Sequence, residues 1–228
     1  MRVMRRWANA SRPDGFDAFA RGLQIIFPAR GDAPLAVALL RLLSAGRPVS
    51  AAALARAVGR ADADVVARVS IWPNIERDEA GAIVGFAGLT LRPTPHGFTV
   101  GNRQLHTWCA WDTLFLPALL YETADVRSAC PVSGSAVELV VAPDGVTRAR
   151  PGDLHVSFPP LAATDTADIP GSFCCHVFFL AGTAAARTWR ETRADDTVVD
   201  VDAAFELGRR AMTPLLHPVS STLMEVRR

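Results

Sequence analysis

The chain has 228 residues, of which 50% are hydrophobic and 21% charged, a composition typical of a folded globular protein and unlike a disordered one. Its formal net charge of +1 argues against broad electrostatic capture of nucleic acid or of an anionic membrane. The longest apolar run, residues 114–121, is far shorter than the roughly 20 residues that cross a bilayer. The basic, polar residues 1–22 lack the apolar segment of a signal peptide. We therefore expect a cytoplasmic protein without nucleic-acid or membrane partners, whose four cysteines are not structural disulfides.

The first part of the chain has the pattern of a winged helix-turn-helix. Residues 1–32 are expected to be an N-terminal extension with room for a short helix. Apolar periodicity and turn residues then predict three helices and a hairpin of two strands, over residues 34–43, 51–58, 65–71, 82–91 and 97–100. Residues 33–100 are accordingly expected to form a winged-helix-like domain. The third helix carries Asp62 and Asp64, a poor match to phosphates, so we expect no DNA binding.

The second part, residues 101–228, mixes helix and strand signals. One helix is expected within residues 105–120 and another over 202–212. Short strands are predicted between them, over residues 136–142, 154–158 and 173–180. The chain contains no dinucleotide-binding glycine motif, phosphate-binding loop, zinc-protease motif or nucleophile elbow. Any chemistry must therefore come from residues outside these common motifs.

A thiol and a carboxylate lie close together in the stretch 108–112, which reads WCAWD. If Thr107 caps the predicted helix, Cys109 lies in its first turn, where backbone N–H groups and the helix dipole lower the pKa of a thiol. Asp112 follows three residues later on the same helical face, where the two groups can exchange a proton. A buried structural cysteine would also explain Cys109. It would not explain Asp112 in an apolar stretch, because a buried carboxylate is costly unless paired or used.

A second cluster, SFCCHV over residues 172–177, lies in a predicted strand, in which alternate residues face opposite sides. Cys174 and His176 would share one face and Cys175 the other. We interpret Cys175 as a core residue and His176 as a hydrogen-bonded structural residue. Cys130 lies in a turn with no CxxC partner, so its spacing does not support a zinc site, and we interpret it as buried and structural. Two thiols and a carboxylate favour thiol chemistry or a soft metal.

At these residues the chain resembles the alkylmercury lyases, the organomercurial lyases of bacterial mercury-resistance systems. The matching motifs follow in order within residues 34–215: GRPVS at 46–50, GLTLR at 88–92, WCAWDTL at 108–114 and SFCCHV at 172–177. Together they are specific, whereas none would be alone. Trp111 departs from the family pattern, which has a smaller aliphatic residue there. The resemblance implies an α+β fold, a winged-helix-like module followed by a mixed α/β catalytic domain with antiparallel strands, here residues 101–228.

The resemblance also implies a reaction, protonolysis of a carbon–mercury bond that yields Hg(II) and a hydrocarbon. Carried over by position, Cys109 and Cys174 would be the mercury-binding thiolates, and Asp112 would carry the proton and share in binding the metal. Trp108 would line the substrate pocket, and Cys175 would be dispensable. Mercury would be substrate and product, so no cofactor is expected. External thiols would support turnover, and mercuric reductase would accept the Hg(II).

Two other functions remain as alternatives. A cytoplasmic winged-helix regulator would sense a thiophilic metal through Cys109 and Cys174, although the near-neutral charge counts against DNA binding. A thiol-dependent hydrolase would use Cys109 as nucleophile and would need a histidine base oriented by a third group. His106 lies three residues before Cys109, but the sequence offers no orienting partner for it. Release of methane from methylmercury would separate a lyase from both alternatives.

Overall fold

The structure, a computed structural model, describes residues 16–26 and 32–216. Within these ranges the α-helices and 3₁₀ helices (η) are α1 (Phe16–Gly22), η1 (Leu23–Ile26), α2 (Ala33–Leu43), α3 (Ala51–Val58), α4 (Asp62–Ser70), α5 (Asp112–Leu120), η3 (Leu161–Ala163), α6 (Ile169–Ser172), η4 (Cys174–His176), α7 (Thr183–Thr192), α8 (Val201–Ala211) and α9 (Thr213–Leu216). The strands are β1 (Ile75–Arg77), β2 (Ile83–Phe86), β3 (Leu89–Thr90), β4 (His96–Val100), β5 (Arg103–Thr107), β6 (Ala124–Ala129), β7 (Ala136–Ala142), β8 (Gly145–Arg150), β9 (Leu154–Phe158), β10 (Phe179–Ala181) and β11 (Thr197–Asp200).

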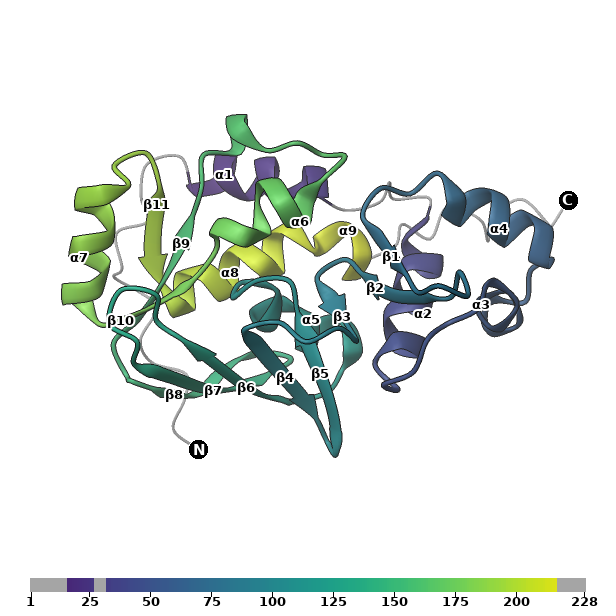
Figure 1. Cartoon of the computed structure of the whole chain (residues 1–228), viewed down its shortest axis with the longest axis horizontal. Coiled ribbons are helices and arrows are strands. Elements are labelled where there is room, and N and C mark those ends of the chain that lie inside the picture. The colour runs from purple at the N-terminus through teal and green to yellow at the C-terminus, as the bar shows by residue number, and fades with distance from the viewer. Residues whose placement is uncertain (1–15, 27–31, 217–228) are drawn as a thin grey trace, which may run out of the picture.

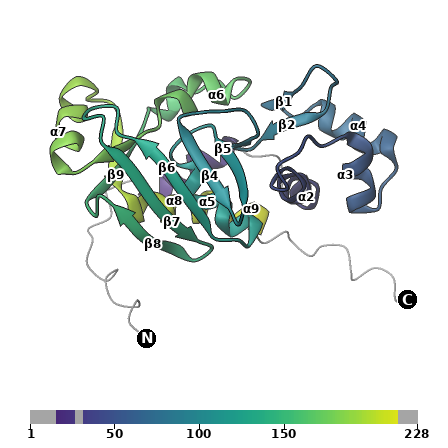
Figure 2. The same ribbon diagram turned by 60° about the horizontal axis from the view of Figure 1, so that its bottom comes forward.

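Two antiparallel sheets form the framework. The larger has eight strands in the order β1-β2-β3-β5-β4-β6-β7-β8, and the smaller has the order β10-β9-β11. Helix α8 contacts α5, β8, β9 and β11, so it bridges the two sheets. Figure 2 shows the large sheet in front, with α5, α8 and α9 behind it. Helices α2, α3 and α4 gather at one end of the molecule and α7 lies at the other (Figure 1). The predicted α+β class, with a helical N-terminal module and antiparallel strands, is confirmed.

Local sequence signals explain the helices of the N-terminal module. Ser50 caps α3 by accepting a hydrogen bond from the N–H of Ala53 at 3.2 Å, and Gly59 ends the helix in a left-handed conformation with φ of 66°. Pro34 lies in the first turn of α2, where it costs no hydrogen bond. The predicted extension is described only in part, because residues 1–15 and 27–31 lie outside the described residues. The division after residues 32 and 100 stays a prediction, and the large sheet continues across residue 100.

The predicted hairpin between residues 82–91 and 97–100 is wrong. The continuous apolar run breaks at Ala87 and Gly88, whose φ angles of 49° and 93° form a two-residue turn between β2 and β3. A positive φ at both turn residues matches the twist of paired strands, so the chain folds back there. Strand β4 pairs instead with β5 and β6.

Two expected elements of the second half also differ from the structure. Within residues 105–120 the chain first completes β5 and only then forms α5, so the helix is shorter than predicted and begins at Asp112. Residues 173–180 are not one strand, because η4 occupies their first half and β10 begins at Phe179. Helix α5 is buried at every position except Ala118, so packing rather than an amphipathic pattern stabilises it.

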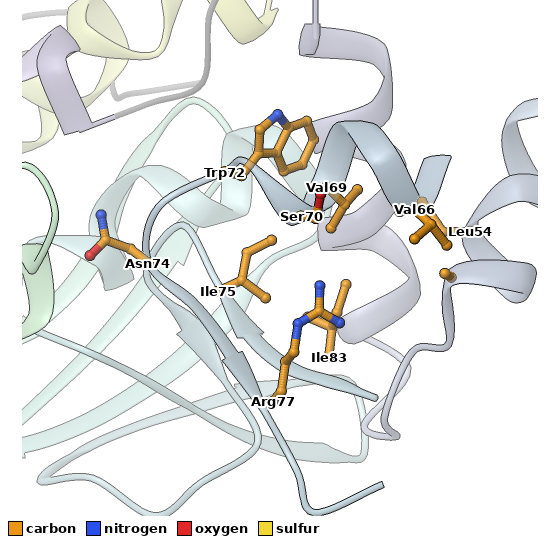
Figure 3. Close-up of a pocket in the computed structure, with 10 residues that line it drawn as sticks. Leu54, Val66, Val69, Ser70, Trp72, Asn74, Ile75, Arg77 and Ile83 are labelled. Atoms are coloured by element: carbon orange, nitrogen blue, oxygen red, sulfur yellow. The ribbon is translucent and has the colours of Figure 1, made fainter. Parts of the chain in front are cut away.

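The N-terminal module is hollowed between α3, α4 and the β1–β2 hairpin (Figure 3). The cavity measures about 460 Å³, and Val69, Trp72, Ile75 and Ile83 are among the side chains that line it. None of its lining residues belongs to the two cysteine clusters.

In the part of the chain that the structure describes, no helix has the length and apolar character needed to cross a bilayer.

We expect no sequence-specific DNA binding by this module. Helix α4 carries Asp62 and Asp64 in its first turn, and its Arg68 forms a 2.5 Å ion pair with Asp32 instead of standing free for a phosphate. Specific protein–DNA complexes have Kd values of about 10⁻⁸–10⁻¹¹ M at physiological salt. Selection from a random-sequence duplex library, followed by gel shift at that salt, should yield no enriched site. Sub-micromolar binding to one enriched sequence would contradict this expectation.

Candidate active site

Cys109 lies in a short connection between β5 and α5, held by its own neighbours. Its backbone N–H donates to Oδ2 of Asp112 at 2.9 Å, so the carboxylate reaches back over three residues. The hydroxyl of Thr107 donates to the carbonyl of Cys109 at 2.8 Å. Thr107 therefore fixes the connection. It does not cap a helix that contains Cys109, contrary to the expectation from the sequence. The proximity of Cys109 and Asp112 comes from this turn and not from a helical face.

Two further backbone hydrogen bonds tie this connection to distant parts of the chain. The N–H of Trp108 donates to the carbonyl of Gly88 at 2.9 Å, in the turn between β2 and β3. The N–H of Ala110 donates to the carbonyl of Val177 at 3.3 Å, immediately after η4. The second bond brings the two cysteine clusters together, although they are more than 60 residues apart in the sequence.

Cys174 begins η4, which follows the short helix α6. The N–H of Val177 donates to the carbonyl of Cys174 at 3.1 Å and closes the turn. Cys174 is buried, whereas Cys175 is exposed and its thiol donates to the carbonyl of Gly171 at 2.9 Å. The two cysteines thus diverge because of a 3₁₀ turn and not because of strand alternation. The interpretation of Cys175 as a core residue is wrong.

The two clusters meet in a buried site. The sulfurs of Cys109 and Cys174 and a carboxylate oxygen of Asp112 all lie within 4.8 Å of one another. Their residues are 0%, 3% and 2% exposed, respectively. Two sulfurs that bind the same soft ion, each slightly beyond the roughly 2.3 Å of a Zn–S bond, lie no more than about 5 Å apart. The spacing therefore suits one thiophilic ion held by both sulfurs, with the carboxylate beside it.

Burial favours the neutral, protonated forms of these groups. It raises the pKa of Asp112 to about 7, although hydrogen bonds with Cys109 act in the opposite direction. Burial also raises the pKa of the Cys109 thiol well above its usual value, with further contributions from Cys174 and from the charge of Asp112. The hydrogen bond with Cys109 lowers the pKa of Cys174, but burial and the Asp112 charge raise it more. The expected lowering of the Cys109 pKa by a helix dipole is therefore wrong.

The remaining candidate residues lie outside this cluster of three. Cys130 is buried among Leu180, Ala186 and other apolar residues, in agreement with its interpretation as buried. Trp108 is half-buried, and its indole N–H is enclosed without a hydrogen-bond partner among the described residues. Among the described residues, the His106 side chain has hydrogen bonds with the backbone of Thr94, which offers no orienting group for a catalytic base.

The structure adds Trp111 and Gly88 to the residues that shape the site. The Trp111 ring packs against Phe115 and Phe158, and its indole N–H donates to the carbonyl of Ala204 in α8 at 2.9 Å. Trp111 thereby anchors the start of α5 beside Asp112. Gly88 lies against Asp112 itself. The GLTLR motif includes Gly88, but nothing in the sequence indicates which residue it contacts.

Family models cover most of the chain. Residues 89–213, more than half of the chain, match the family described as alkylmercury lyase. Residues 28–87 match the helix-turn-helix domain of alkylmercury lyase. The two matches meet in the turn between β2 and β3.

Individual relatives agree with the family models. An alkylmercury lyase of Pseudomonas putida is 45% identical over 184 residues, covering 81% of this chain and 85% of that protein. An alkylmercury lyase of Streptomyces lividans is 42% identical over 178 residues, covering 78% and 81%. The solved mercury-bound form of MerB2 shares the fold, with a TM-score of 0.71 at 23% identity, covering 89% of this chain and 99% of that one. Since the family model spans the buried thiol–carboxylate site and these two relatives match over most of both chains, the chain belongs to the alkylmercury lyase family.

Proposed function

We propose that this protein is an organomercurial lyase, which cleaves the carbon–mercury bond of alkyl and aryl mercury compounds to give Hg(II) and a hydrocarbon. The observation that carries the proposal is the buried set of Cys109, Cys174 and Asp112 with ligand atoms within 4.8 Å of one another. Thiolates are the preferred protein ligands of soft metals, and a neighbouring carboxyl group can hold a proton for the carbon. Membership of the alkylmercury lyase family supports the same reaction.

The two thiols and the carboxylate account for every atom that the reaction moves. The thiol of Cys109 gives its proton to Asp112 and forms the first sulfur–mercury bond, displacing the ligand X of the substrate R–Hg–X. Cys174 gives up its thiol proton, which leaves with X as HX, and forms the second sulfur–mercury bond. This bond raises the electron density on mercury and polarises the carbon–mercury bond toward carbon. The protonated Asp112 then donates to the carbon as that bond breaks. The sum is R–Hg–X plus two thiols giving R–H, HX and a dithiolate of Hg(II).

The surroundings of Asp112 suit a proton carrier. A carboxyl group with a pKa of about 7 is present in both forms near neutral pH, so it can accept a proton from a thiol and return it. The hydrogen bond from the Cys109 backbone keeps the carboxylate beside the sulfurs. Positioning of this kind removes the entropic cost of bringing donor and carbon together.

Methane release tests the reaction directly. The purified chain, incubated with methylmercury and excess small thiol, should release one methane for each Hg(II) formed, measured by gas chromatography and mercury analysis. The expected product follows from transfer of one proton to the methyl carbon. Tight methylmercury binding without methane would contradict the proposal and would favour the metal-sensing alternative.

The partners and conditions of turnover follow from the same chemistry. We propose that no cofactor takes part, because the thiols and the carboxyl group supply all the protons and ligands. External thiols would remove Hg(II) from its buried site, and mercuric reductase would accept it.

Trp108 would line the path of the organic group, and its enclosed indole N–H lies one residue from Cys109. A cytoplasmic location would keep Cys109 and Cys174 reduced, and both are free in the structure.

A further inference from the structure

Gly88 packs directly on the carboxyl group of Asp112. A Cβ atom at this position would lie 2.5 Å from Cγ, 2.6 Å from Oδ1 and 2.9 Å from Cβ of Asp112. Apart from its chain neighbours, these are the three nearest atoms among the described residues, and all three belong to the proposed proton carrier. The carboxyl group of Asp112 therefore occupies the space that a side chain at residue 88 would fill.

The same glycine also holds the chain that leads to Cys109. Its carbonyl accepts the hydrogen bond from Trp108, and the next residue, Leu89, pairs with Thr107 in the sheet. Its φ of 93° belongs to the left-handed region that glycine adopts at no steric cost. Gly88 thus lies against the chain on both sides of Cys109, with its carbonyl bonded to Trp108 and its side-chain position facing Asp112.

The Asp112 carboxyl group is contacted on both of its oxygen sides. Oδ2 accepts the hydrogen bond from Cys109, and the Oδ1 side faces the backbone of Gly88. Water has little access, because Asp112 is only 2% exposed. A displacement of the carboxyl group by even the width of a methyl group would break the hydrogen bond from Cys109 or change the distance between the carboxyl group and the sulfurs.

We propose that Gly88 is a positioning residue, which sets the carboxyl group of Asp112 for proton delivery by offering backbone where any other residue would place a side chain. The inference rests on the proposed function, since it assigns a task to the carboxyl group. Proton transfer needs donor and acceptor within hydrogen-bond reach, so the effect should appear in the chemical step more than in substrate binding.

Comparison of Gly88→Ala with Gly81→Ala isolates this role. Gly81 lies in the neighbouring β1–β2 turn with φ of 79°, and a Cβ there meets nothing within 4 Å. Both variants suffer the same kind of backbone strain, but only Gly88→Ala displaces Asp112. We expect kcat for organomercurial cleavage to fall at least about 10-fold in Gly88→Ala, with KM within about 3-fold. Gly81→Ala should stay within about 2-fold of the wild type in both constants.

The pH profile gives a readout that a general loss of stability would not produce. If the Cβ separates the carboxylate from the N–H of Cys109, the charged form loses a hydrogen bond and the pKa of Asp112 rises. The limb on which kcat falls with falling pH should then move to higher pH in Gly88→Ala and stay in place in Gly81→Ala. Equal kcat values or identical pH limbs in the two variants would overturn the positioning role.

A stability cycle tests the contact without relying on activity. Gly88→Ala should lower the Tm more than Gly81→Ala in the wild-type background. In the Asp112→Gly background the difference between the two substitutions should shrink, because the three atoms nearest to the new Cβ are gone. If Gly88→Ala is insoluble, Gly88→Ala/Asp112→Gly should recover a folded chain, and failure to do so would also overturn the inference.

The two proposals can fail separately. If the wild-type chain cleaves no organomercurial, the proposed function is wrong, and so is the positioning task assigned to Gly88. The stability cycle still reports whether residue 88 contacts Asp112. If the wild type releases methane and Gly88→Ala behaves as Gly81→Ala does, only the positioning role is wrong.

Discussion

Cys109→Ser and Cys174→Ser should each lower organomercurial cleavage by on the order of 10³-fold or more, because residues that act as a unit cannot be removed singly at small cost. A hydroxyl group is a poor ligand for a soft metal, so either change leaves one sulfur on mercury and a less polarised carbon–mercury bond. The double variant should cleave organomercurials about as fast as the less active of the two single variants. Methane release at saturating methylmercury, with circular dichroism as a check on folding, measures the effect.

Cys175→Ser provides the matched control for these two variants. Cys175 follows Cys174 directly, but its thiol is exposed and bonds to the carbonyl of Gly171. Its replacement should leave cleavage within about 3-fold of the wild type. A Cys109→Ser variant that keeps more than about one tenth of wild-type activity would contradict the two-thiolate reaction.

Asp112→Asn should retain stoichiometric Hg(II) binding and lose about 10²–10⁴-fold in turnover. The two sulfurs remain as ligands, but an amide cannot take a proton from a thiol and pass it to carbon. Asp112→Ser should keep part of the activity, since a hydroxyl group can relay a proton through water. Turnover of Asp112→Asn within a few-fold of the wild type, with mercury bound, would refute the role of the carboxyl group.

The pH dependence offers a second measurement on the same residue. Burial raises the pKa of Asp112 from 3.8 to about 7, so kcat should fall as the pH drops below about 7, where the carboxyl group already holds a proton and cannot accept the one from the Cys109 thiol. Between pH 3.8 and about 7 the folded chain keeps a proton that the unfolded chain releases, so this contribution to stability declines as the pH rises. The decline should be absent from the Tm profile of Asp112→Asn.

Local signals were sufficient for much of the fold. The helix over residues 51–58 and the strands over 136–142 and 154–158 have the predicted bounds, because caps, glycine stops and alternation are encoded within each segment. The failures fall where long-range contacts decide the backbone. The turn at Ala87 and Gly88 interrupts an apolar run that looks like one strand.

The candidate site divides in the same way. Cys109, Asp112 and Cys174 could be selected from residue type and family motifs, and the structure does bring them together. Their geometry could not be predicted, because the hydrogen bond from Ala110 to Val177 joins segments distant in sequence. The contact of Gly88 with Asp112 is equally non-local, and glycine carries no chemical group to mark it.

The continuity of the large sheet has a consequence for how the protein holds together. Strands β1 and β2 lie in the part matched by the helix-turn-helix family, and β3 begins the part matched by the lyase family. The backbone bonds between β2 and β3 make this junction part of one hydrogen-bonded ladder, unlike a flexible tether between independent bodies. A fragment starting at Leu89 would present β3 with an open edge, a surface that invites pairing with other chains. A continuous sheet therefore joins the helical module to the part of the chain that carries Cys109, Asp112 and Cys174.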